Sequence, residues 1–219
     1  MIKTTSGEIK TDQLTGTVNI ETSTGDITVG QVTGDAHIKT NSGSIQSESI
    51  LGNVQVAASS GDISVQRIDG DVTAESSSGD IKIYQGSGRR MVSTTSGEIV
   101  LSQVAAAWEA ESSSGDVTIK AQEGSGSIRT TSGDIHLDLD KLTGNLTLES
   151  SSGSAAIRIS QDNAFAFKAD TSNGDIDTFF DDKLDFSKKG NSAKGVYGTK
   201  DTGSQIVVRT TSGDVRVTN

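Results

Sequence analysis

Few side chains in this sequence are suited to catalysis. The chain of 219 residues has two histidines and no cysteine, so thiolate chemistry and disulfide bonds are excluded. His37 and His136 lie far apart in the sequence, and no serine stands in a G-x-S-x-G nucleophile elbow. A phosphate-binding loop of the form G-x-x-x-x-G-K-S/T is also missing. We therefore expect no enzymatic activity and no cofactor.

Carboxylates recur at one equivalent position of the sequence, directly after a glycine. If the fold stacks these positions about 5 Å apart, neighbouring carboxylates repel by roughly 0.8 kcal/mol per pair even in water. Either each carboxylate orders its own corner and is otherwise solvated, or the row binds Ca²⁺ weakly. A dedicated metal site is not expected, because calcium-binding nonapeptide repeats need G-G-x-G-x-D and this spacing is absent. The ladder consists of Asp26, Asp62, Asp80, Glu98, Asp116 and Asp134.

A third group of residues breaks the pattern of its neighbours. Arg90, Trp108 and Gly126 share a position that valine or alanine occupies earlier in the chain. In one interpretation Trp108 fills the space beside Gly126 and Arg90 is rotated outward, because an arginine is not buried unpaired. In the other, the wall opens, Arg90 lies against the Trp108 ring as a cation–π pair, and Arg89 marks an anion or sugar contact. Arg89, Arg90 and Trp108 are therefore a candidate partner contact.

A repeat of 18 residues has to position all these side chains. One set of glycines recurs every 18 residues inside a Ser/Thr-Ser/Thr-Gly-Asp/Glu-Ile motif, and a second set lies half-way between, with Ala106 at its one gap. Aliphatic residues stand two and four positions after each motif glycine, which is the period of a strand with one buried face. The first set is Gly7, Gly25, Gly43, Gly61, Gly79, Gly97, Gly115 and Gly133, and the second is Gly16, Gly34, Gly52, Gly70, Gly88 and Gly124.

The repeat predicts an all-β, single-domain parallel β-solenoid. Each 18-residue coil would consist of two nine-residue halves, with inward aliphatic side chains stacked on their equivalents at about 4.8 Å. Glycine would take positive φ at the corner. We expect regular coils over residues 1–152, irregular coils and a cap over residues 153–219, and a further domain before residue 1.

The pattern loosens near the C-terminus, where all five phenylalanines lie. Solenoids need atypical terminal coils to close the core, and bulky aromatic side chains in wider coils serve this purpose. An aromatic-filled end of the core is therefore expected, with a ligand groove as the alternative. The aromatic residues are Phe165, Phe167, Phe179, Phe180 and Phe186.

Charge and hydropathy limit the partners. The net charge of −10 argues against binding to nucleic acid or directly to an anionic membrane. No apolar run approaches the roughly 18 residues needed to cross a bilayer, so no transmembrane segment is expected in this chain. A protein or glycan partner is consistent with an acidic surface.

The tandem SSGDI and TTSGEI motifs resemble those of the bacterial "putative adhesin" family of β-solenoid repeat proteins. The resemblance covers nearly the whole chain, down to TTSGDV at residues 210–215. It implies a surface or envelope-associated role, linked in some members to envelope-stress responses, and it supplies no catalytic residues.

From the resemblance and the rod shape we expect a non-enzymatic module for adhesion, recognition or spacing at the cell surface or the outer side of the bacterial envelope. The alternative is a membrane-tethered or cytoplasmic scaffold in an envelope-stress regulatory system. A carbohydrate-active β-helix enzyme is the least favoured class, because its cleft needs long loops and the corners here are tight.

Overall fold

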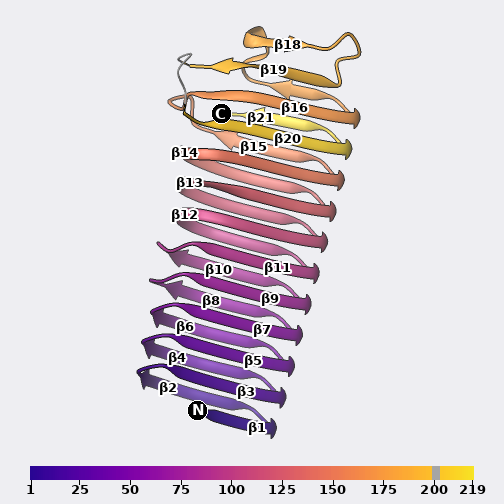
Figure 1. Cartoon of the computed structure of the whole chain (residues 1–219). Helices are drawn as coiled ribbons and strands as arrows, with labels where there is room; N and C mark the ends of the chain where they lie inside the picture. Colours follow the sequence, from indigo (N-terminus) through magenta and orange to yellow (C-terminus); the bar gives the residue numbers. More distant parts are fainter. Residues whose placement is uncertain (199–202) are drawn as a thin grey trace.

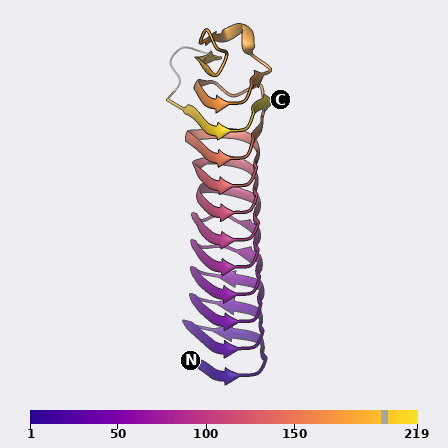
Figure 2. The ribbon, with the colours of Figure 1, turned by 90° about the vertical axis from the view of Figure 1, so that its right-hand side faces the viewer.

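The computed structural model describes residues 1–198 and 203–219, which form a straight rod of stacked coils (Figures 1 and 2). Each regular coil contributes one extended segment to each of two faces, as the repeat predicts. Among the described residues, no helix has the length and apolar character needed to cross a membrane.

Strands β1 to β11 follow the nine-residue halves of the repeat, and β12, β13 and β14 each run through both halves of one coil. In the regular part they are β1 (Ile2–Ser6), β2 (Ile9–Thr15), β3 (Val18–Thr24), β4 (Ile27–Thr33), β5 (Ala36–Ser42), β6 (Ile45–Leu51), β7 (Val54–Ser60), β8 (Ile63–Ile68), β9 (Val72–Ser78), β10 (Ile81–Gly86), β11 (Arg90–Ser96), β12 (Ile99–Ser114), β13 (Val117–Ser132) and β14 (Ile135–Ser152). The C-terminal part contains β15 (Ala155–Ile159), β16 (Phe165–Asn173), β17 (Ile176–Thr178), the 3-10 turn η1 (Asp181–Lys183), β18 (Leu184–Phe186), β19 (Ser192–Tyr197), β20 (Gln205–Ser212) and β21 (Val215–Thr218).

The parallel register confirms the 18-residue coil. Ile27 pairs with Ile9 below it and with Ile45 above it, and Ile63 continues the same column. All four side chains are buried, because like aliphatic residues lie over one another along the axis. The result is a thin, continuous core that a chain poor in large apolar residues can fill.

At many levels, the corner of a motif glycine is held by that glycine and by a buried or half-buried hydroxyl group of the next coil. Gly79 has φ of +149°, and its carbonyl oxygen accepts a hydrogen bond of 3.2 Å from Oγ1 of Thr94. The same bond joins Ser112 to Gly97 and Thr130 to Gly115. The first hydroxyl of the Thr/Ser run is thus an internal partner for the corner, which explains why a polar residue occupies an inward position.

The C-terminal segment does not stack in the order of the sequence. Strand β20 pairs in parallel with β14 on one side and with β16 on the other, and β21 lies between β15 and β17. Gly213 consequently stands over Gly153, and Gly174 over Gly213. The last two strands of the chain, β20 and β21, therefore form a level of the solenoid between that of β14 and β15 and that of β16 and β17 (Figure 1).

An aromatic cluster closes this end of the core, as expected. Phe165 and Phe180 have ring centroids 5.6 Å apart, and Tyr197 packs on both at 5.5 and 5.1 Å. Strand β19 supplies Tyr197 and runs antiparallel to β16 and β18, so it covers the last parallel coil. Phe186 differs from the other phenylalanines, because it remains 41% exposed at the rim of the cap.

Candidate functional site

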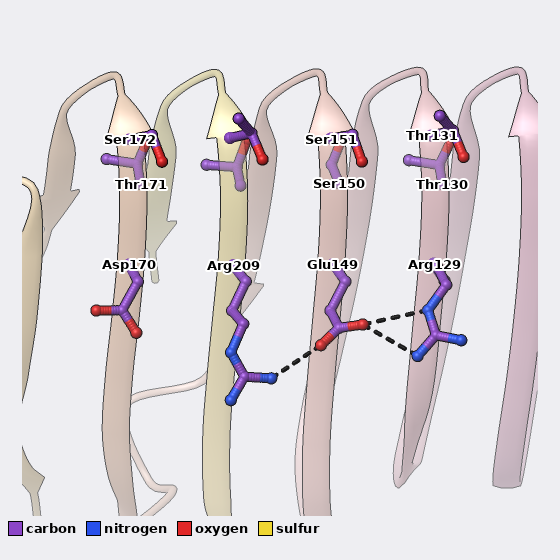
Figure 3. Close-up of a pocket in the computed structure, with 12 residues that line it drawn as sticks. Arg129, Thr130, Thr131, Glu149, Ser150, Ser151, Asp170, Thr171, Ser172 and Arg209 are labelled. Atoms are coloured by element: carbon purple, nitrogen blue, oxygen red, sulfur yellow. Dashed lines mark hydrogen bonds and ion pairs between the residues drawn. The ribbon is translucent and has the colours of Figure 1, made fainter.

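The candidate site is a shallow groove of about 440 Å³ on the face formed by β13, β14, β20 and β16 (Figure 3). Equivalent positions of four adjacent levels line it, so the groove consists of three parallel rows of side chains. One row is charged, the next is a buried hydroxyl row, and the third is an exposed hydroxyl row. Insertion of β20 between β14 and β16 is what brings the fourth level into place.

The charged row alternates in sign across the levels. Glu149 accepts hydrogen bonds from Arg129 Nε at 3.1 Å and Nη2 at 3.0 Å, and from Arg209 Nη1 at 2.8 Å. Asp170 lies on the far side of Arg209 in the register and accepts a bond of 2.7 Å from Oγ of Ser192. The charges of this row are compensated within the chain, so it presents ordered polarity without an excess charge.

The two hydroxyl rows have different roles. Thr210 and Thr171 are buried and donate to the carbonyl oxygens of Gly153 and Gly213 at 3.0 and 3.1 Å. The residues that follow them, Thr211 and Ser172, are exposed. Together with Thr131 and Ser151, these side chains give the groove a row of hydroxyl groups that can both donate to and accept from a ligand.

The ion pairs of the groove predict an acid-sensitive stability. The hydrogen bond from Arg209, followed by that from Arg129, holds the pKa of Glu149 below its ordinary value. A depressed folded-state pKa contributes stability above the usual carboxyl pKa of about 4.3 and loses it as the pH falls through the folded-state pKa. Glu149→Gln should therefore cost roughly 0.2–1 kcal/mol at pH 7 and nothing at the acidic end, as measured by urea unfolding across pH. Glu48→Gln is the control, because the exposed Glu48 makes no ion pair with a described residue; an equal effect of both variants would contradict the assignment.

The carboxylate ladder is a set of hydrogen-bond acceptors between coils. Asp62 accepts the backbone N–H of Asp80 at 2.9 Å, and Asp80 accepts that of Glu98 at 2.9 Å. The backbone bond from Glu98, with Lys82, lowers the pKa of Asp80. The expectation that each carboxylate orders its own corner is thus corrected: the side chain is long enough to reach the corner of the next coil. The same bond runs from Ser44 to Asp26, from Asp134 to Asp116 and from Ser154 to Asp134.

Aspartate and glutamate are not equivalent in this ladder. The Glu98 carboxylate lies 3.9 Å from Nζ of Lys82, and Glu98 is not among the acceptors of corner N–H groups. A second row, which the sequence reasoning missed, occurs at the half-way corners, where Asp35 accepts the N–H of Asn53 and Asp71 accepts that of Arg89. Within residues 1–198 and 203–219 no three His, Cys, Asp or Glu side chains gather as a metal site. Weak binding of Ca²⁺ to the ladder stays a prediction.

Arg90 is buried, so the expectation that it is rotated outward is wrong. Its Nη1 donates to the carbonyl oxygens of Gly88 at 2.7 Å and Gly70 at 2.9 Å, and its Nη2 donates to that of Ile68 at 3.3 Å. Neutral carbonyl groups thus act as partners of the buried guanidinium, which the sequence-based interpretation did not consider. Burial lowers the pKa of Arg90, and Asp71 opposes this shift. Space for the guanidinium comes from Gly86, where a side chain would overlap Nη2.

Trp108 fills space left by glycines, as the packing interpretation predicts. It is 2% exposed and pairs in register with Arg90 and Gly126. Side chains at Gly124 and Gly126 would overlap its ring. Of the three candidate contact residues, only Arg89 is exposed, and it bonds Glu109 at 3.3 Å. The structure therefore places Arg90 and Trp108 in the wall of the rod rather than on its surface.

The two histidines lie on different parts of the rod. His37 is half-buried in β5 and His136 is exposed in β14, with β12 and β13 among the strands between them. The solenoid does not bring them together.

The groove itself was not predicted from the sequence. Its charged residues are far apart in the chain, since Arg209 follows Glu149 by 60 residues. A signal exists in the motif TTSGD, which occurs at residues 130–134 and again at 210–214. This recurrence marks residues 205–218 as a regular level, but it does not give the place of that level in the stack.

Comparison with known proteins gives a family. A family model described as Toastrack DUF4097 matches residues 1–125 and, in a second match, residues 48–218. No curated protein matches the chain. No solved structure matches it either.

Proposed function

This chain belongs to the Toastrack DUF4097 family, a family of β-solenoid repeats without an assigned activity, and from this premise we propose a function in recognition. The protein acts as a non-enzymatic rod at the bacterial envelope, where it binds a surface partner or spaces attached domains. Adhesion is the form of this role that the rod shape favours.

The single observation that carries the proposal is the groove on β13, β14, β20 and β16. Its charges are compensated within the chain, and its outer row of hydroxyl groups remains exposed. A rigid surface of this kind loses little conformational entropy on binding, because the coils already fix its side chains. Compensated charge favours a glycan or protein partner over a polyanion, which the net charge of −10 repels.

Co-sedimentation with isolated bacterial envelopes tests the proposal. The purified protein should sediment with the envelopes, and Thr131→Lys with Thr211→Lys should weaken binding about tenfold, because two long side chains obstruct the groove. Ser59→Lys with Ser77→Lys is the matched control, since these exposed hydroxyls occupy the same row on β7 and β9, in the N-terminal half of the rod. Failure of the unchanged protein to sediment, or equal losses in both variants, would exclude recognition through this groove.

The location is tested separately in the bacterium that produces the protein. Protease added to intact cells should degrade an envelope-exposed rod. Full protection until the cells are lysed would instead favour the scaffold in an envelope-stress regulatory system.

A further inference from the structure

A second hollow lies half-way along the rod, away from the groove of Figure 3. Its volume is about 440 Å³, and it opens at the corner that ends β8, β10 and the first half of β12. Its polar lining comes from Arg67, Asp69, Gln85, Ser87, Gln103 and Gln122.

The backbone departs from the repeat at this hollow. The register between β12 and β13 shifts on both sides of Val104, which is the signature of a β-bulge. Gln103 has φ of +52°, the one positive φ of a non-glycine residue in the part of the chain that the structure describes. A non-glycine residue with this backbone conformation costs free energy, and the regular coils avoid this cost by placing glycine at positive φ. At this bulge, Nε2 of Gln85 donates to Oε1 of Gln103 at 2.6 Å.

The floor of the hollow is held from inside the rod. Gly86 lies in the lining, and the guanidinium of Arg90 passes directly beneath it. The carbonyl groups that Arg90 binds, those of Ile68, Gly70 and Gly88, belong to the two corners on which the hollow rests. Arg90 is thus a positioning residue for this surface, although its own side chain is buried.

The lining is polar and nearly balanced in charge. Arg67 pairs with Asp69 at 3.2 Å, and the other polar groups are three carboxamides and one hydroxyl. Each carboxamide both donates and accepts, which matches the adjacent hydroxyl groups of a sugar. The hollow disfavours an anionic ligand for two reasons. An anion would have to displace Asp69 from Arg67. The guanidinium of Arg90 already donates to carbonyl groups inside the rod.

We propose that this hollow binds a neutral oligosaccharide, with Gln85, Gln103 and Gln122 as its hydrogen-bonding groups. The proposal goes beyond recognition through the groove and does not depend on where the protein is located. It assigns a ligand class to the region around Arg90 and Trp108, with contacts made by the carboxamides above these residues.

Side-chain amide NMR spectra of the full chain test the proposal, with cellohexaose and chitohexaose as probes. One of these oligosaccharides at millimolar concentration should shift the signals of Gln85, Gln103 and Gln122 in a saturable way. Gln13 and Gln31 should not shift, although they form the same inter-coil pair at 3.4 Å in a regular part of the rod.

Matched double variants separate specific from general effects. Gln85→Ala with Gln103→Ala should weaken binding about tenfold or more, because two ligand hydrogen bonds are lost. Gln13→Ala with Gln31→Ala should leave binding unchanged, and circular dichroism should show that both variants keep the fold. Absence of shifts with both probes, equal losses in the two variants, or competition by inorganic phosphate would overturn the proposal. These outcomes leave envelope binding through the groove untouched, since that is measured with different variants.

Discussion

Gly79→Ala is expected to destabilise the rod by roughly 2–6 kcal/mol, which is among the largest effects expected from adding one methyl group to this chain. Two costs add. The backbone at Gly79 has φ of +149°, which residues with a Cβ rarely adopt. The added methyl group would also overlap the carbonyl oxygen of Gly61 in the coil below. Neither the added methyl group nor the Gly61 carbonyl oxygen can move easily, because the backbone of both glycines is hydrogen-bonded to neighbouring coils.

Gly7→Ala is the matched control for this prediction. Gly7 stands in the same column with φ of +109°, but no atom lies within 4 Å of the position that its Cβ would take. Only the conformational cost of roughly 1–3 kcal/mol therefore remains. Urea unfolding followed by circular dichroism measures both variants. Equal losses would show that conformation alone explains the glycines, and that close stacking of the corners contributes nothing.

The regular part of the fold could be predicted from the sequence. Aliphatic residues at a period of two define the strands, and glycines at a period of 18 define the corners, so each coil is specified by its own residues. The register of Ile27 on Ile9 and Ile45 then follows without knowledge of distant contacts. The same local logic explains why the aromatic residues were correctly expected to close the core.

Features that depend on the order of stacking were not predictable in this way. A regular coil such as 205–218 matches any other regular coil, because regular levels offer the same columns of side chains. Its place between β14 and β16 is decided by the cap, which β19 builds on β16. The groove with Arg129, Glu149 and Arg209 exists only after that choice, so its residues carry no local signal of their proximity.

Burial of Arg90 was missed for a different physical reason. Arg90 was expected to turn outward because no inward partner was evident in the sequence, whereas the corners of this solenoid present backbone carbonyl groups to its guanidinium. Gly70 and Gly88 supply two of these acceptors, and Gly86 supplies the space. Extra glycines near an inward arginine are therefore a usable signal, since each marks a place where a neighbouring side chain fills the volume.

Trp108→Ala is expected to destabilise the protein by roughly 3–5 kcal/mol, as is usual for removing a buried tryptophan. Two glycines, Gly124 and Gly126, face its ring, so neither of these positions has a side chain that could fill the resulting cavity. Thermal and urea unfolding should be followed by circular dichroism, because the variant lacks the one tryptophan of the chain. Met91→Ala is the control, since Met91 lies next to Arg90 on the outer face and is 41% exposed; it should change stability by about 0.5 kcal/mol or less.

The Trp108 variant also decides between the two roles considered for this residue. A contact residue on the surface would lose partner binding with little loss of stability, whereas a residue that fills the wall would show the reverse. With Trp108 2% exposed, a large loss of stability is the expected result. Oligosaccharide binding should weaken only to the extent that the floor of the hollow becomes less ordered. Trp108 is the register partner of Arg90, and Arg90 binds the corner carbonyl groups of Gly70 and Gly88. Loss of binding in a variant of unchanged stability would instead place Trp108 in contact with the ligand, and the rod would then have to open at this level.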